Sequence, residues 1–232
     1  MTAAAALKRK LASGETLTVV NADHPSPSLV EALGRLPIDA VFIDCEQGSP
    51  DFESVEDMAR AARAVGLASI VRVFGREDWI IERFLFRGVD GLVVPRVDSA
   101  EEAKRVVGAV RYCCSGSDAD RLLVVQVESV AAVRDLDRLL AVEGIDVFFV
   151  GPVDLARSMG HGGAYHRPEV QAEIDRVIAA VRGASRAAGM LVGREDVERY
   201  RRAGVQFLYV HANAFLAWGA EAFASTLRQA AT

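Results

Sequence analysis

Short apolar runs alternate with segments of helical periodicity along the whole chain, and this alternation limits the fold more than any other feature. Such a pattern is typical of βα units built around a parallel sheet. The predicted strands are Thr16–Val20, Ala40–Glu46, Ser69–Val73, Gly91–Val97, Leu122–Ser129, Asp146–Gly151, Met190–Gly193 and Phe207–Ala212. The predicted helices are Ser28–Leu36, Ser54–Val65, Asp78–Arg87, Ala100–Tyr112, Val130–Val142, Pro168–Ala188, Glu195–Arg202 and Ala214–Gln229.

The number of units favours one architecture. Eight βα units in 232 residues predict an α/β fold, a (β/α)8 TIM barrel that forms a single domain over residues 1–232, with its chemistry at the C-terminal ends of the strands. Glycines shortly before several strands support the count, because helix C-termini favour a residue that tolerates positive φ. An open doubly wound sheet is the alternative. It is disfavoured because no Gly-rich phosphate motif follows the first strand.

Composition narrows the classes of partner. The apolar fraction of 51% and the charged fraction of 25% are those of a soluble globular protein, and no apolar run reaches the roughly 18 residues of a membrane span. The net charge of −5 leaves no basic stripe for nucleic acid. The segment Met1–Leu11 lacks the charge order of a secretory signal and predicts a surface helix. Three cysteines without disulfide or zinc spacing complete the expectation of a cytoplasmic protein that binds a small molecule.

Polar side chains follow the predicted strands, at the end where a barrel would bring them together. They are Asn21 to His24, Asp44 to Gln47, Arg72, Arg96, Gln126, Glu128, Asp154, Arg194 and His211. Glu128 and Asp154 end neighbouring strands, and carboxylates without clustered His or Cys favour a hard cation such as Mg²⁺ or Mn²⁺. Each carboxylate also has a possible structural role in place of metal binding. Asp154 would cap a helix that begins near Leu155, and Glu128 would form an ion pair with Arg96.

Several motifs together resemble those of one enzyme family. They are Phe42-Ile-Asp-Cys-Glu-Gln47, Ile70-Val-Arg72, Val94-Pro95 with Val97-Asp98, Val125-Gln-Val-Glu-Ser129, and Val142-Glu-Gly-Ile-Asp146 leading into Val150-Gly-Pro-Val-Asp-Leu155 with Ser158 and Gly160. In order and spacing they resemble the metal-dependent (class II) pyruvate aldolases of the HpcH/HpaI aldolase/citrate lyase superfamily. That family includes 4-hydroxy-2-oxoheptanedioate aldolase, 2-dehydro-3-deoxyglucarate aldolase and macrophomate synthase. The resemblance covers nearly the whole chain.

The resemblance implies a metal-binding barrel enzyme. Glu128 and Asp154 would hold Mg²⁺, Mn²⁺ or Co²⁺, and a 2-oxo acid would complete the shell, so that the cation stabilises an enolate. Arg72 would bind the oxo oxygen, and Gln126 would orient the metal ligands. The backbone at Gly151, Pro152 and Val153 would bind the substrate carboxylate. The resemblance further implies a homo-oligomer, a trimer or hexamer, whose last helix packs against or is exchanged with a neighbouring subunit. The apolar side chains of Phe215, Trp218 and Phe223 in that helix support this.

The chain departs from the family at the proton-transfer group. Gln47 stands where the family has a His paired with the carboxylate matched by Asp44, and an amide does not titrate. His211, which ends the last strand, is the candidate replacement, with His24 the other imidazole near that face. A hydrogen-bonded residue at the rim is the alternative role for His211.

Two further departures bear on specificity. Arg96 and Arg194 add positive charge near the expected site. They either bind a second carboxylate or phosphate of the substrate, or pair with Glu46 and Glu195. The stretch from Cys113 to Asp120 is shorter than the family's Pro- and Gly-rich loop. This predicts a site that is more open, or one closed by a neighbouring subunit.

The sequence therefore predicts a divalent-metal-dependent carbon–carbon lyase. It would cleave a 4-hydroxy-2-oxo acid to pyruvate or a related 2-oxo acid and an aldehyde, with Arg72, Asp44, Gln47 and His211 at the reacting centre. One alternative keeps the enolate chemistry but ends in decarboxylation, hydration or an acyl-CoA lyase step. The other alternative is a catalytically silent barrel that binds a metabolite or serves as a partner subunit.

Overall fold

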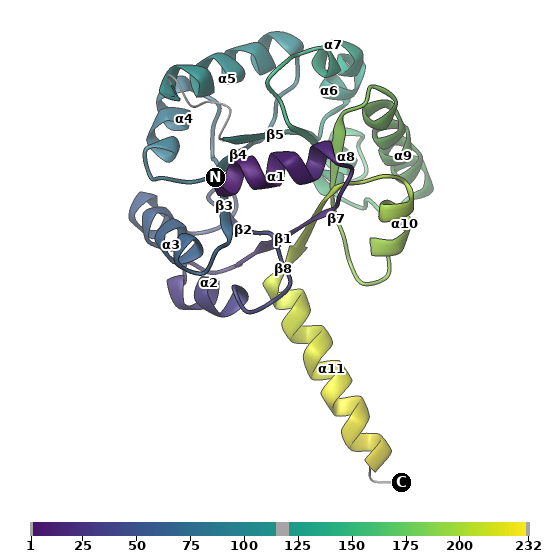
Figure 1. Cartoon of the computed structure of the whole chain (residues 1–232). Helices are drawn as coiled ribbons and strands as arrows, with labels where there is room; N and C mark the ends of the chain where they lie inside the picture. Colours follow the sequence, from purple (N-terminus) through teal and green to yellow (C-terminus); the bar gives the residue numbers. More distant parts are fainter. Residues whose placement is uncertain (1, 115–120, 231–232) are drawn as a thin grey trace.

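The computed structural model, which describes residues 2–114 and 121–230, is a closed barrel of parallel strands with helices around it (Figure 1). All eight strands pair in sequence order, and β8 pairs with β1 to close the barrel. The strands are β1 (Leu17–Asn21), β2 (Ala40–Asp44), β3 (Ala68–Arg72), β4 (Gly91–Val94), β5 (Leu122–Val127), β6 (Val147–Val150), β7 (Ala187–Leu191) and β8 (Phe207–His211). The predicted (β/α)8 fold is confirmed.

Ten helices in the described residues surround or cover the strands, and an eleventh leaves the barrel. They are α1 (Ala3–Ala12), α2 (Pro27–Leu33), α3 (Phe52–Ala64), α4 (Asp78–Leu85), α5 (Ala100–Cys113), α6 (Val130–Arg134), α7 (Leu136–Leu140), α8 (Pro152–Ser158), α9 (Pro168–Gly183), α10 (Val197–Arg202) and α11 (Ala212–Ala230). Figure 1 shows α1 lying across one end of the barrel and α11 projecting away from it. Leu7 and Leu11 of α1 join the apolar cluster inside the barrel, so α1 covers the end opposite to the polar strand ends.

Acidic residues directly before alternate strands fasten the N-terminal end of the barrel; they are Asp39, Asp90 and Asp146. Each donates its N–H to the carbonyl of one residue in the preceding strand and accepts that residue's N–H on its carboxylate. The partners are Thr18, Ser69 and Leu123. Before β8, Gln206 takes the same place, and its N–H donates to Ala188. These bonds satisfy strand-end groups away from the polar mouth.

Two predicted helices are wrong in extent, and one helix begins earlier than expected. The helix predicted over Val130–Val142 is broken at Asp135, whose carboxylate accepts the N–H of Ala100 and so ties α6 and α7 to the start of α5. The helix predicted over Pro168–Ala188 ends at Gly183, and Ser185 adopts a φ of 57° that stops it. The helix expected near Leu155 is α8, which begins at Pro152.

The strand predicted at Met190–Gly193 begins earlier, at Ala187. Its first residues are Ala187, Ala188 and Gly189, which do not favour strands. A Cβ built on Gly189 would lie 2.8 Å from Cδ2 of Phe149, which points into the barrel from β6. The ring of Phe149 therefore leaves no room for a side chain at Gly189, and local strand propensity does not reveal this constraint. The predicted strands Ala40–Glu46, Gly91–Val97 and Leu122–Ser129 end two to three residues earlier in the structure, at Asp44, Val94 and Val127.

Two further expectations concern the loop before β5 and the absence of a membrane-spanning helix. The shortened loop expected at Cys113 to Asp120 falls mostly on residues 115–120, which lie outside the described residues. Among the helices that are described, none has the length and apolarity that crossing a bilayer requires.

The hydrogen bonds of the acidic residues at the N-terminal end of the barrel give a first prediction. We expect Asp90→Ala to lower the free energy of unfolding by about 1–3 kcal/mol, because the N–H and hydroxyl of Ser69 lose the carboxylate oxygen that lies 2.9 and 3.1 Å away. The midpoint of thermal unfolding, followed by circular dichroism, should fall by roughly 2–4 °C per kcal/mol. Asp90→Asn keeps an acceptor oxygen and is the control. A fall of the same size in both variants would contradict the role of the carboxylate.

Candidate active site

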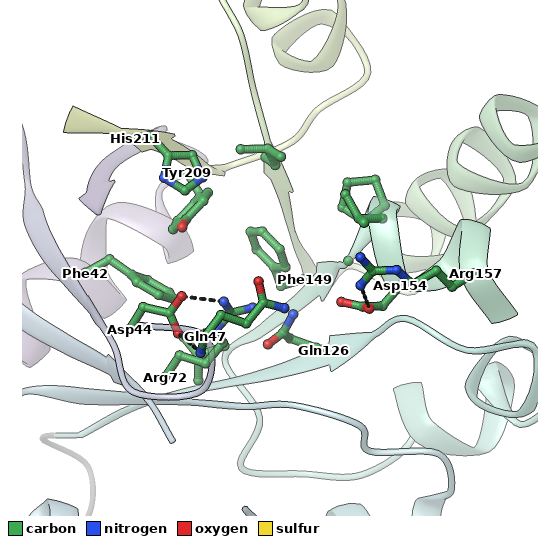
Figure 2. Close-up of a pocket in the computed structure, with 15 residues that line it drawn as sticks. Phe42, Asp44, Gln47, Arg72, Gln126, Phe149, Asp154, Arg157, Tyr209 and His211 are labelled. Atoms are coloured by element: carbon green, nitrogen blue, oxygen red, sulfur yellow. Dashed lines mark hydrogen bonds and ion pairs between the residues drawn. The ribbon is translucent and has the colours of Figure 1, made fainter. Parts of the chain in front are cut away.

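A cavity of about 170 Å³ opens at the C-terminal ends of the strands (Figure 2). Nine of the residues predicted for the site line it: Asp44, Gln47, Arg72, Gln126, Gly151, Pro152, Val153, Asp154 and His211. They come from β2, β3, β5, β8 and the loops and helix that follow β2 and β6. Closure of the barrel therefore brings together side chains that are far apart in the sequence.

Arg72 is a fixed cation at the base of this cavity. Its Nε donates to Oδ1 of Asp44 at 2.9 Å and its Nη2 to Oδ2 at 2.5 Å, while Nη1 lies 3.3 Å from Oε2 of Glu46. Burial lowers the pKa of Arg72, but the hydrogen bonds and charge of Asp44, with the charge of Glu46, outweigh it and raise the pKa above its ordinary value. The paired bonds hold the guanidinium plane. Arg72 is thus a charged group held in one orientation at the cavity.

Asp44 serves Arg72 and the loop after β2. Besides its two bonds to the guanidinium, its Oδ1 accepts the N–H groups of Glu46 and Gln47 at 3.1 and 3.2 Å. Both carboxylate oxygens are therefore engaged. Asp44 thus fixes both the Arg72 cation and the backbone of the loop that carries Gln47.

Glu128 carries a buried carboxylate with no ion pair in the described part of the chain. The residue is 4% exposed, its Oε1 accepts the N–H of Arg96 at 2.7 Å, and its Oε2 accepts Nε2 of Gln126 at 2.7 Å. Burial raises its pKa to about 7 against the lowering effect of the Arg96 N–H, and the charges of Glu46 and Asp154 raise it further. Several carboxylates thus concentrate negative charge at this side of the mouth.

The donor groups here fit a hard cation. Asp154 uses Oδ1 for an ion pair with Arg157 at 2.7 Å. The Oε1 atom of Gln126 is buried and has no hydrogen-bond partner among the described residues. Oxygen donors and uncompensated negative charge suit Mg²⁺ or Mn²⁺. The described residues contain no group of three or more His, Cys, Asp or Glu side chains that could hold a metal on its own, so a ligand or water would have to complete the shell.

Two structural roles were considered for these carboxylates, an ion pair of Glu128 with Arg96 and a helix cap at Asp154. The structure shows neither. Arg96 contacts Glu128 through its backbone N–H, and its own side chain is 74% exposed and lies 3.4 Å from Glu46. Asp154 lies inside the first turn of α8 and does not cap it. Neither Arg96 nor Arg194 lines the cavity.

His211 belongs to a pair at the edge of the cavity. Its Nδ1 lies 2.5 Å from Oδ1 of Asp23, and Oδ2 of Asp23 accepts the N–H of Asn213 at 2.8 Å. A second cavity of about 230 Å³ adjoins the first between β1 and β2, and His211 lines both cavities with Phe42, Asp44 and Gln47.

Sequence reasoning did not single out Tyr209, Phe149 or Arg157, which also line the first cavity. Tyr209 lies two residues before His211 in β8, and strand alternation places both on the inner side. This alternation in the sequence could have predicted that Tyr209 lies in the site. Arg157 lies on α8, three residues after Asp154, and a helix beginning at the Gly-Pro pair would have placed it there.

Comparisons with known proteins agree on one family. Residues 19–218 match the model of the HpcH/HpaI aldolase/citrate lyase family. A hydroxypyruvate/pyruvate aldolase of Agrobacterium fabrum (strain C58) is 37% identical over 222 residues, which are 85% of this chain and 81% of the relative. A 5-keto-4-deoxy-D-glucarate aldolase of Salmonella arizonae is 32% identical over 80% of this chain and 81% of its own. A crystal structure of an HpcH/HpaI aldolase/citrate lyase family protein from Burkholderia cenocepacia superimposes with a TM-score of 0.87 at 29% identity, covering 98% of this chain and 99% of that one.

Close packing at Gly151 gives the second prediction. A Cβ there would lie 2.6 Å from Oε2 of Glu128 and 3.3 Å from Nε2 of Gln126. We expect Gly151→Ala to displace the Glu128 carboxylate and to cost about 1–3 kcal/mol of unfolding free energy, as overpacking does. Chemical denaturation measures the change.

Gly108 is the matched control. It lies in α5 with nothing within 4 Å of a built Cβ, so Gly108→Ala should be neutral or stabilise by about 0.5–1 kcal/mol. Equal stability of wild type and Gly151→Ala would contradict the tight fit.

Proposed function

Because the chain belongs to the HpcH/HpaI aldolase/citrate lyase family, we propose that it is a divalent-metal-dependent carbon–carbon lyase. The resemblance seen in the motifs is confirmed by these matches, and the aldolases among the relatives are lyases. The proposed reaction cleaves a 4-hydroxy-2-oxo acid to pyruvate or a related 2-oxo acid and an aldehyde, and runs the reverse condensation. The observation that carries it is the fixed Arg72 cation in the same cavity as Gln126 and the start of α8.

Different residues of the cavity would bind different parts of a 2-oxo acid. The guanidinium of Arg72, held by Asp44, faces the cavity where it would bind the oxo oxygen and counter the negative charge that grows there during cleavage. The first N–H groups of α8, after Gly151 and Pro152, lack intrahelical partners and would bind the substrate carboxylate. The unpartnered Oε1 of Gln126 would accept a hydrogen bond from a water or ligand in the cavity.

Glu128 and Asp154 are the proposed residues for Mg²⁺, Mn²⁺ or Co²⁺. Their oxygens, the raised pKa of Glu128 and the nearby charge of Glu46 support this. A divalent cation bound there would act as a Lewis acid on the 2-oxo group and offset charge on its enolate. Gln126 holds the Glu128 carboxylate in place through its Nε2.

The third prediction tests this function. Incubated with Mg²⁺ and pyruvate in deuterated water, the protein should exchange the methyl protons of pyruvate, and proton NMR should follow their loss. Chelation of the metal and Glu128→Gln should each slow exchange by at least 100-fold, because the enolate loses its counter-charge. Glu173→Gln, which alters a surface carboxylate paired with Arg176, is the control.

Other outcomes favour the alternatives. No exchange with pyruvate or any other 2-oxo acid, despite bound metal, would contradict the enolate-forming function and support a silent metabolite-binding barrel. Exchange with release of carbon dioxide, or with addition of water, would support the decarboxylase or hydratase alternative.

We also propose that the protein is a homo-oligomer, a trimer or hexamer, in which α11 packs against or is exchanged with a neighbouring subunit. Only Ala212 is buried among the residues of α11. Leu216, Phe223 and Leu227 are 67%, 68% and 57% exposed, and their spacing puts them on one face of the helix. An apolar face of this kind supports burial against another protein chain.

The fourth prediction concerns this helix. Phe223→Asp combined with Leu227→Asp should shift the mass measured by light scattering from that of an oligomer towards the 25.0 kDa of one chain, since charge is costly in an apolar interface. Ser225→Asp, on the opposite face of α11, should leave the mass unchanged. A monomeric wild type would contradict the proposal.

A cytoplasmic location remains part of the proposal. It is supported by the thiols of Cys45, Cys113 and Cys114, none of which is in a disulfide. The proposed small-molecule partner is the 2-oxo acid substrate, without a role for nucleic acid or a membrane.

A further inference from the structure

We propose that Asp23 and His211 form a proton-transfer pair, in which Nε2 of His211 exchanges a proton with the C4 oxygen of the substrate and Asp23 is the positioning residue. The inference rests on the proposed lyase function and assigns the group that moves this proton.

The geometry of the pair leaves one ring nitrogen available. Nδ1 of His211 is 2.5 Å from Oδ1 of Asp23, whose side chain is 9% exposed. A buried carboxylate at Nδ1 favours the tautomer that carries its proton there, so that Nε2 is the acceptor. No group of the described residues bonds to Nε2, and the His211 side chain is 44% exposed at the mouth.

The position of Asp23 is fixed by β1 and β8 together. Its backbone has a φ of 62°, in the left-handed region that Asp tolerates better than most residues. Its N–H donates to Oδ1 of Asn21 at 3.0 Å, and Nδ2 of Asn21 donates to the hydroxyl of Tyr209 at 2.8 Å. The ring of Tyr209 lies 5.1 Å from that of His211 in an edge contact. The pair is therefore held by a connected set of bonds and not by one loop alone.

Other groups that line the first cavity are poorly suited to this proton transfer. Both oxygens of Asp44 are bonded to Arg72, and Gln47 does not titrate. Asp154 is paired with Arg157 and is proposed to bind the metal. Burial raises the pKa of Tyr209 far above its usual range, so its phenol stays neutral. Among the described lining residues, His211 is the remaining side chain with a nitrogen that can both accept and donate a proton.

The two cavities place His211 near the bond that breaks. Arg72 and Gln126 line only the first cavity, and Asn21, Asp23 and His24 line only the second. A 2-oxo acid bound at Arg72 would extend its C4 end past His211 into the second cavity. The described lining of that cavity contains no Arg or Lys, which suits an uncharged hydroxylated aldehyde.

The step balances without a further reagent. In cleavage, Nε2 accepts the proton of the C4 hydroxyl, and the O–H electron pair becomes the second bond of the aldehyde carbonyl. The C3–C4 bond breaks, and its electron pair stays on C3 as the enolate of the 2-oxo acid. The imidazolium beside Asp23 is stabilised by that carboxylate. The imidazolium then returns this proton, through water, to C3, which becomes the methyl group of the 2-oxo acid and leaves His211 neutral again. Condensation follows the reverse path.

A purely structural role is a separate alternative, because Oδ2 of Asp23 also accepts the N–H of Asn213 at the start of α11. Asp23→Asn separates the two roles. The amide oxygen can still accept from Asn213, while the amide NH₂ facing Nδ1 would force the proton of His211 onto Nε2. The fold and α11 would be kept, but Nε2 could no longer accept a proton.

The fifth prediction uses the intact Mg²⁺-loaded protein and the aldols of pyruvate with glycolaldehyde and with glyceraldehyde, following pyruvate release. We expect kcat to fall by roughly 10²–10⁴-fold in His211→Ala and in Asp23→Asn, the size of a lost acid–base group, with KM little changed. Added imidazole should restore turnover to His211→Ala and not to Asp23→Asn. Nitrogen NMR of the histidines, four in the chain, should show the tautomer of His211 inverted in Asp23→Asn.

The matched control is His166→Ala, which removes an imidazole that contacts the ring of Tyr165 at a tilt and lines neither cavity. It should keep the wild-type kcat. A kcat within threefold of wild type in folded His211→Ala would overturn the inference. So would wild-type exchange of pyruvate protons without cleavage of either aldol, or loss of activity in Asp23→Asn with an unchanged tautomer. Absence of both exchange and cleavage in the wild type would refute the proposed function itself.

Discussion

The hydrogen bonding of β8 to β1 is the constraint on which the rest of the structure depends. Five residue pairs join the two strands in parallel, from Leu17 with Phe207 to Asn21 with His211. This closure turns a row of βα units into a ring, so none of the eight described strands has an unpaired edge. It also brings the first and last strand ends together, so the Asp23–His211 contact joins residues 188 positions apart. Without closure the mouth would lose the cavities that it encloses.

Electrostatics then divides the mouth into two halves. On one side, Arg72 is held between Asp44 and Glu46 and remains cationic despite burial. On the other, Glu128 is buried without an ion pair among the described residues, and its carboxylate is bound by the Arg96 N–H and the Gln126 amide. A 2-oxo acid carries both negative and polarisable oxygens, so the proposed substrate would complement the fixed cation and a metal ion held at the proposed ligands.

Much of the fold could be predicted from local pattern, and the exceptions have tertiary causes. Strands such as Ala40–Asp44 and Leu122–Val127 are continuous apolar runs because both of their faces are buried. The Ala-Ala-Gly start of β7 carries no such signal, and its glycine, Gly189, is packed closely against the ring of Phe149 from β6. The strand-end position of Arg72, Gln126 and Glu128 was visible in the sequence. Their partners were not, since Arg96 meets Glu128 through a backbone N–H.

The sequence by itself determined the number and order of the units, the end of the barrel where polar groups collect, and the family. Periodicity and motifs are local properties, and a parallel barrel converts them directly into position. Only the tertiary structure decided which groups pair. Asp44 turned out to hold Arg72 with both oxygens, and His211 met Asp23 across the closure of β1 and β8. Such pairs depend on register and on side-chain direction between distant strands, and no local pattern in one chain encodes them.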